Sequence, residues 1–150
     1  MCFGAEAPWR LLGVAETEFE ARVELNADLC VVDGVHFFIR GHIEIPVRGL
    51  DEPFAWSVWC SVSEASFQHV NERWHAPDRG DDAPYFGWLC TRLPTYPDTL
   101  NLRAHVQSRQ VGQVPAVRLA PTDHPLAMEQ RDGMDMNRLA EIAHAVLGDL

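Results

Sequence analysis

The stretch "DLCVVDGVHFFIRGHIEIPV", residues 28–47, decides the fold. Two runs rich in β-branched and aromatic residues flank Asp33-Gly34, a dipeptide that favours the tight turn of a β-hairpin. In the second run, apolar and small residues alternate with polar ones. Such period-two alternation is typical of a strand with one buried face. The stretch predicts a hairpin whose second arm turns one face to the core, namely Phe37, Ile39, Gly41, Ile43, Ile45 and Val47.

Further strands are predicted downstream of this hairpin. Residues 54–63, "FAWSVWCSVS", are apolar on both faces, which indicates a central strand. The segments "YFGWLCTRL" (85–93), "TLNLRAHVQSRQ" (99–110) and "AVRLA" (116–120) indicate three more strands separated by turns. Strands joined mostly by short turns favour antiparallel pairing.

Helices are predicted at three places outside the strands. Residues 15–24 are acidic and helix-favouring, and predict a short surface helix. Ser63 is a suitable N-cap for a helix over 64–75. Asp135 is a suitable N-cap for a closing amphipathic helix.

This order of elements predicts the fold class. No Pro/Gly-rich linker or low-complexity tract divides residues 1–150. We therefore expect a single α+β domain, with a mostly antiparallel sheet and three or four helices packed on one face.

The charged residues exclude several kinds of chemistry. The chain has 22 acidic and 12 basic residues, for a net charge of −10, and every basic residue is arginine. The absence of lysine excludes Schiff-base chemistry and a P-loop. The negative charge argues against nucleic acid and against an anionic membrane surface as partners.

The N-terminal sequence and the cysteines predict the compartment. We find neither a signal-peptide pattern at the N-terminus nor an apolar run of membrane-spanning length. The chain is therefore expected to be cytoplasmic, with Cys2, Cys30, Cys60 and Cys90 as free thiols.

Five blocks of sequence resemble a bacterial family. They are "FGAEAPW" (3–9), "FFIRGHIEIPV" (37–47), "FAWSVWCSVSEASF" (54–67), "YFGWLCTRLPTYPDTLNL" (85–102) and "PTDHPLAMEQRDG" (121–133). Together they resemble family 2199 of domains of unknown function, over residues 3–147. The resemblance implies a small bacterial protein and does not imply any particular activity. Members commonly begin with a CxxCG-type segment that looks like a zinc knuckle. That segment is expected to be absent here, with only Cys2 remaining.

The block at 121–133 has two interpretations. Asp123 and His124 are adjacent polar groups of the kind found in catalytic pairs. The same block also has the pattern of a short helix, with Asp123 as N-cap, Pro125 in the first turn and Gly133 after the last. We favour the helix, because it accounts for every unusual residue in the block.

The polar face of the long strand is the second candidate site. Arg40, His42 and Glu44 lie on that face, and His42 with one neighbour could contact a single ligand. The competing interpretation is a solvated sheet face of mixed charge. Among the tryptophans, Trp9 is the one expected to lie partly exposed.

Two functional hypotheses follow. The first is a non-catalytic binding or regulatory module, because no complete catalytic set, metal set or cofactor motif is found. The alternative is a small hydrolase or ligand-modifying enzyme that uses Asp123 and His124. Either way the partner is a small molecule or a protein, and a homodimer is compatible with the sequence. The candidate ligand-binding residues are Arg40, His42, Glu44, Asp123 and His124.

Overall fold

The computed structural model describes residues 2–3 and 7–148, so part of the block at 3–9 lies outside the described residues. The strands are β1 (Cys2–Phe3), β2 (Val23–Leu25), β3 (Leu29–Val32), β4 (His36–Ile45), β5 (Phe54–Val62), β6 (Tyr85–Leu89), β7 (Arg103–Gln107) and β8 (Ala116–Leu119). The helices are α1 (Phe19–Arg22), α2 (Glu64–Glu72), α3 (Pro125–Asp132) and α4 (Met136–Leu147), with 3₁₀ turns η1 (Pro8–Arg10), η2 (Glu16–Glu18) and η3 (Arg79–Asp81).

The predicted hairpin is confirmed as β3 and β4, which pair antiparallel. Asp33 and Gly34 both have positive φ, at 55° and 68°, as a tight hairpin turn requires. The predicted inner face is also confirmed, because Ile39, Ile43 and Ile45 are fully buried.

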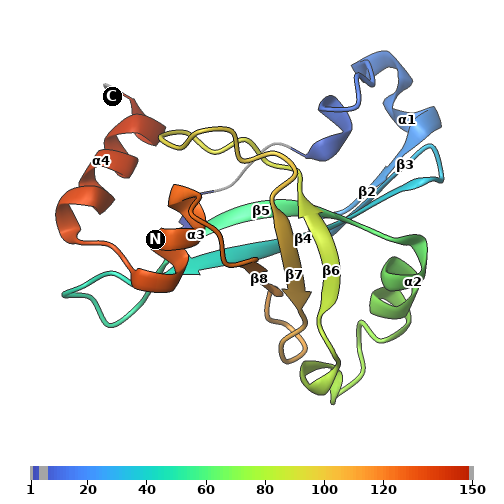
Figure 1. The fold of residues 1–150 in the computed structure, drawn as a ribbon. Coiled ribbons are helices and arrows are strands. Elements are labelled where there is room, and N and C mark those ends of the chain that lie inside the picture. The colour runs from blue at the N-terminus through green and yellow to red at the C-terminus, as the bar shows by residue number, and fades with distance from the viewer. Residues whose placement is uncertain (1, 4–6, 149–150) are drawn as a thin grey trace.

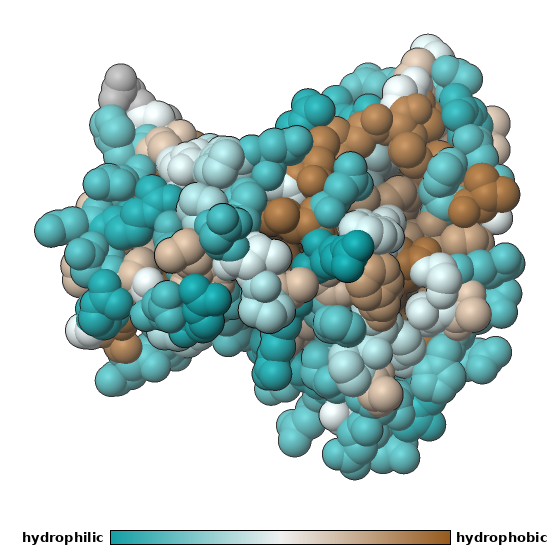
Figure 2. All heavy atoms as spheres, in the orientation of Figure 1, coloured by the Kyte–Doolittle hydropathy of each residue, from teal (hydrophilic) through white to brown (hydrophobic). Residues whose placement is uncertain are grey.

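Strands β4 to β8 form a closed five-stranded barrel (Figure 1). Each of these strands pairs antiparallel with the next along the chain. The barrel closes where β8 returns beside β4 in parallel, at the pair His42–Ala116. The short strands β1, β2 and β3 extend the sheet outside the barrel. On the face in view, the surface is notched between α4 and the N-terminal segment that contains η1, η2 and α1 (Figures 1 and 2).

Closure depends on a glycine in β4. A Cβ atom at Gly41 would lie 2.5 Å from Val117 Cγ2 and 2.9 Å from the carbonyl oxygen of Pro115. Those distances are too short for any side chain, so β8 approaches β4 this closely only because position 41 has none. Next to it, the amide of His42 donates to the Pro115 carbonyl at 2.9 Å.

The expected fold class is therefore wrong. The structure is dominated by its sheet, and the helices are short and do not form a layer on one face. Instead α3 and α4 lie toward one end of the barrel and α2 toward the other (Figure 1). An alternating pattern reports that one face of a strand is buried. It does not report whether helices or the opposite wall of a barrel bury that face.

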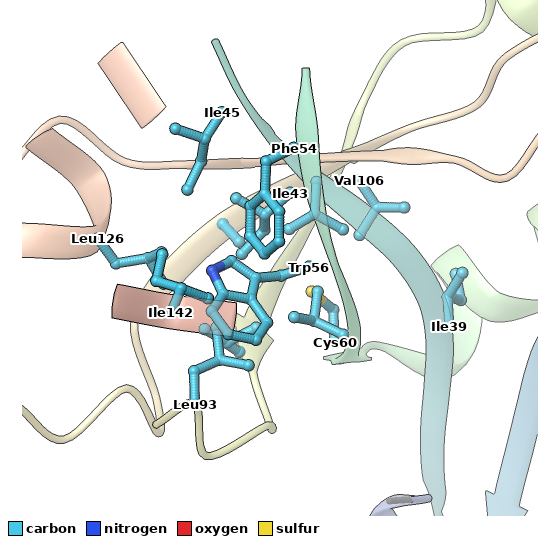
Figure 3. Close-up of a cluster of buried hydrophobic side chains, with 14 of the residues drawn as sticks. Ile39, Ile43, Ile45, Phe54, Trp56, Cys60, Leu93, Val106, Leu126 and Ile142 are labelled. Carbon is cyan, nitrogen blue, oxygen red and sulfur yellow. The ribbon is translucent and has the colours of Figure 1, made fainter. Parts of the chain in front are cut away.

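The barrel interior is the main core, and α3 and α4 contribute to it. Trp56 is 1% exposed, and Leu126 of α3 and Ile142 of α4 point toward it (Figure 3). The indole of Trp56 donates to the Tyr96 hydroxyl at 3.2 Å, which satisfies its polar atom. The apolar faces of these helices are buried against the end of the barrel.

A second core lies on the outer side of β4 and β5. Phe38 and Trp59 are buried there by the N-terminal segment, with Trp9 only 7% exposed. The expectation that Trp9 lies partly exposed is therefore wrong. The 3₁₀ turn η1 places its indole against Phe19, with ring centroids 5.0 Å apart. This cluster covers part of the strand face that the sequence pattern marks as polar.

Two of the predicted helix caps are confirmed. The Ser63 side chain accepts from the Ser66 amide at the start of α2. The Asp135 side chain accepts from the Arg138 amide at the start of α4. None of the helices among the described residues is long and apolar enough to cross a membrane.

Candidate functional site

A pocket of about 640 Å³ lies on the barrel wall where β4 and β8 separate. This volume is within the range of small-molecule sites. We call the junction of the two strands, His42–Glu44 against Ala116–Leu119, the β4–β8 seam, and the pocket the seam pocket. Its walls come from β4, β8, α3, the loop after β4 and the loop between β7 and β8. It is lined by His42, Glu44, Pro46, Val47, Leu50, Asp51, Glu52, Pro53, Arg109, Ala116, Val117, Arg118, Leu119, Pro121, Ala127, Gln130 and Arg131.

The side chain of Gln130 takes the place of a strand at the open part of the seam. Its amide oxygen accepts from the Leu119 amide at 2.8 Å, and its amide nitrogen donates to the Val117 carbonyl at 2.8 Å. A neighbouring strand would bond these same two backbone groups. Because Gln130 satisfies them from α3, β4 and β8 can separate without leaving buried polar groups unpaired.

The pocket walls differ in charge. Arg109, Arg118 and Arg131 lie on its β8 and α3 sides, and Arg109 is paired with Glu44 of β4. Arg118 forms no ion pair with any residue that the structure describes, and it is exposed. Asp51 and Glu52 line the wall formed by the loop after β4. Apolar side chains, among them Val47, Leu119 and Ala127, make up much of the remaining lining.

His42 lines the pocket, and its surroundings lower the pKa of its imidazole. Burial lowers the pKa of its imidazole below the ordinary value of 6.5, and the positive charges of Arg40 and Arg109 lower it further. Its Nε2 lies 3.7 Å from the sulfur of Cys2. At neutral pH, His42 is therefore an uncharged group that can donate or accept a hydrogen bond.

The structure separates Arg40 from the other two predicted residues of β4. His42 and Glu44 line the seam pocket, whereas the Arg40 guanidinium bonds the Asp28 carboxylate at 3.1 Å and the Ser57 hydroxyl at 3.0 Å. These bonds, with a further one to the Ala27 carbonyl, fix the β2–β3 connection to the barrel. Arg40 is thus a structural residue here.

The structure also separates Asp123 and His124 from the pocket. The N-cap of α3 is His124, whose Nδ1 accepts from the Leu126 amide at 3.1 Å. Its Nε2 lies 3.0 Å from the Asp98 carbonyl, to which it donates. The expectation that Asp123 caps this helix is therefore wrong, and Asp123 is exposed. The end of the helix is as expected, at Gly133 with φ of 82°.

The sequence interpretation missed Arg109, Arg118 and Gln130. Arg118 is the one polar side chain in "AVRL", and that position is a signal for an outward-facing residue. No local pattern marks Arg109 or Gln130, because their roles depend on contacts with β4 and β8. Among the described residues, no group of three or more His, Cys, Asp or Glu side chains could hold a metal ion.

Fold and pocket together define a small β-barrel protein with a ligand-sized pocket on its wall. The chain belongs to family 2199 of domains of unknown function, described as an uncharacterized protein conserved in bacteria, whose model matches residues 1–134. No curated protein and no solved structure matches the chain significantly.

Proposed function

We propose that this protein is a non-catalytic binding module whose ligand occupies the seam pocket. The proposal rests on Arg118, which has no carboxylate partner among the residues that the structure describes and lines a pocket of about 640 Å³. Arginine suits the bidentate binding of carboxylate or phosphate, and here a ligand would supply the missing anion.

The lining supports a ligand with an apolar body and an anionic group. Val47, Leu119 and Ala127 would contact the body, and Arg118 and Arg131 would contact the anion. His42, uncharged at neutral pH, would supply one further hydrogen bond. The Arg109–Glu44 pair would hold the β4 wall in place.

The alternative of a hydrolase that uses Asp123 and His124 has less support. Both ring nitrogens of His124 are engaged by backbone groups of α3 and of the loop at residue 98. A general base needs a free nitrogen within reach of the proton it removes. We also propose that the protein is cytoplasmic, and the free thiols of Cys2, Cys30, Cys60 and Cys90 support a reducing compartment.

The proposal can be tested with the fluorescent anion 8-anilinonaphthalene-1-sulfonate, which combines an apolar body with one sulfonate. We expect saturable binding that Arg118→Gln weakens about tenfold, the loss typical of one charge-assisted hydrogen bond. Arg92→Gln is the matched control, because Arg92 is exposed and lies outside the pocket lining. Equal affinity in the wild type and in Arg118→Gln would contradict the proposal. Turnover of a panel of esters that His124→Ala abolishes would also contradict it.

A further inference from the structure

An exposed pair of aromatic side chains lies on the outer face of β6. Phe86 is 47% exposed and Trp88 is 38% exposed. Their rings meet edge to face, with centroids 5.2 Å apart and planes at 83°. Hydrophobic side chains gather over the β6 region of the surface, with hydrophilic ones among them (Figure 2). Adjacent exposed aromatic rings of this kind are typical of binding surfaces.

An arginine and a histidine flank this aromatic pair. The Arg103 guanidinium lies 5.6 Å from the centre of the Trp88 ring, and the His105 ring lies 5.9 Å from that of Phe86. We call Phe86, Trp88, Arg103 and His105 the aromatic face. The three strands β6, β7 and β8 contain no aspartate or glutamate, in a chain with 22 of them. The surface is therefore complementary to an anionic partner.

The strand register connects the aromatic face to the seam pocket. Phe86 pairs with His105, and His105 pairs with Arg118, so the three residues form one row across β6, β7 and β8. Arg118 also lines the seam pocket. With strands ~4.8 Å apart, Phe86 lies ~10 Å from Arg118, the length of about three residues of extended peptide.

We propose that the aromatic face and the seam pocket form one extended site, which takes an acidic peptide segment of a partner protein. This inference rests on the proposed function, because Arg118 is common to both surfaces. A carboxylate of the peptide binds at Arg118, and an apolar side chain about three residues further along packs on Phe86 and Trp88. Aromatic anchors and arginine commonly dominate the affinity of such interfaces.

Two other occupants fit the surface less well. A second copy docked by two-fold symmetry would bring this surface against itself, with arginines on both sides and no acidic residue in strands β6 to β8 to pair with them. A single-stranded nucleic acid carries a charge on every phosphate, and the net charge of −10 repels such a polyanion. A short peptide with two or three carboxylates meets less of this repulsion.

The test uses two fluorescein-labelled peptides and the intact chain. The long peptide, Glu-Glu-Ser-Ser-Leu-Phe, carries both the acidic and the apolar groups, and the short peptide, Glu-Glu-Ser-Ser, carries only the acidic ones. We expect fluorescence anisotropy to show the long peptide binding about tenfold more tightly than the short one. Phe86→Ser with Trp88→Ser should remove this difference and leave the short peptide unaffected, whereas Arg118→Gln should weaken both. The control variant is Leu12→Ser, because Leu12 is exposed and lies outside both surfaces. Phe67→Ser would not serve, because Phe67 packs against the core.

The other outcomes of this experiment distinguish failure of the extended site from failure of the proposed function. Equal binding of the two peptides, with Arg118 dependence kept, would overturn the extended site and leave the proposed function standing. Peptide binding that is independent of Arg118 would overturn both the extended site and the proposed function. Tighter binding of an oligothymidylate of about twelve nucleotides than of the long peptide would overturn the peptide class in favour of nucleic acid. A dimer at micromolar concentration that the Phe86 and Trp88 substitutions dissociate would overturn it in favour of a second copy.

Discussion

The two parts of the β4–β8 seam are closed in different ways. At His42 the strands meet backbone to backbone, with the His42 amide bonded to the Pro115 carbonyl at 2.9 Å. At Leu119, a few residues along β8, the strand edge is bonded instead by the side chain of Gln130 from α3. The first part completes the barrel, and the second part opens the seam pocket.

This difference explains how a small barrel can carry a pocket on its wall. A barrel whose strands paired along their whole length would have no gap between them, and its interior here is filled by side chains. Replacing one strand contact by a side-chain amide keeps the hydrogen bonds and frees the space beside them. The seam pocket is thus a consequence of how the barrel closes.

Gly41→Ala should have the largest effect on stability, because it acts on the backbone part of the seam. The new methyl group would lie 2.9 Å from the Pro115 carbonyl oxygen, a backbone atom that cannot move away without opening the barrel. We expect a loss of about 3 kcal/mol in the free energy of unfolding, measured by urea denaturation. The control is Gly80→Ala, where the nearest atom lies 3.6 Å away and a loss of under ~0.5 kcal/mol is expected. Similar losses for both variants would show that Gly41 is not needed for closure.

Gln130→Ala should have a smaller effect, because it acts on the side-chain part of the seam. It leaves the Leu119 amide and the Val117 carbonyl without their partners, for an expected loss of about 2 kcal/mol. Gln130→Glu should fall between Gln130→Ala and the wild type, because a carboxylate can accept from Leu119 and cannot donate to Val117. Gln113→Ala, at an exposed position, is the matched control. An unfolding midpoint unchanged in Gln130→Ala would contradict the strand-like role of this amide.

The N-cap of α3 stabilises the helix that contains Gln130, and its removal should cost less than the loss of Gln130 itself. His124→Ala should lower the free energy of unfolding by about 1 kcal/mol, the usual loss for an N-cap, and Asp135→Ala in α4 should cost the same. Asp123→Ala should change stability by less than ~0.5 kcal/mol, because this side chain is exposed and is not the cap. A larger loss of stability in Asp123→Ala than in His124→Ala would contradict this assignment and would make Asp123 the N-cap, as the sequence pattern predicts.

The smallest effect should come from the protonation of His42 in the seam pocket. Burial lowers its pKa in the folded protein below the value of 6.5 in the unfolded chain, so the unfolded chain binds more protons as the pH falls below this value. The stabilising contribution is therefore present above pH 6.5 and lost at lower pH. Unfolding midpoints at about pH 7.5 and about pH 5.5 should differ less in His42→Gln than in the wild type. An identical pH dependence in the two proteins would show that the pKa of His42 does not change on folding.

The sequence predicts the local elements of this fold well and its closure poorly. The turn at Asp33-Gly34, the caps Ser63 and Asp135 and the buried face of β4 all follow from short-range patterns. Closure depends on the contact of Gly41 with Pro115, which lies far along the chain. A glycine at an apolar position of a strand is the available signal, and it marks a close approach without naming the partner.

The candidate site is predictable only in part for the same reason. His42 and Glu44 follow from the alternation of β4, and both line the pocket. Arg40 belongs to the same alternating pattern but has a structural role, because its guanidinium donates to the Asp28 carboxylate. Gln130 has no local signal at all, because its function is to pair with a strand edge in another segment.

Amide hydrogen exchange at His42 and Leu119 distinguishes the two ways in which the seam is closed. In the wild type, the amides of His42 and Leu119 should both be protected, because each donates to a bonded acceptor. In Gln130→Ala, under native conditions, we expect the Leu119 amide to lose its protection from exchange while the His42 amide keeps it. Retained protection at Leu119, or equal loss at both residues, would contradict the claim that a side chain closes one part of the seam and the backbone the other.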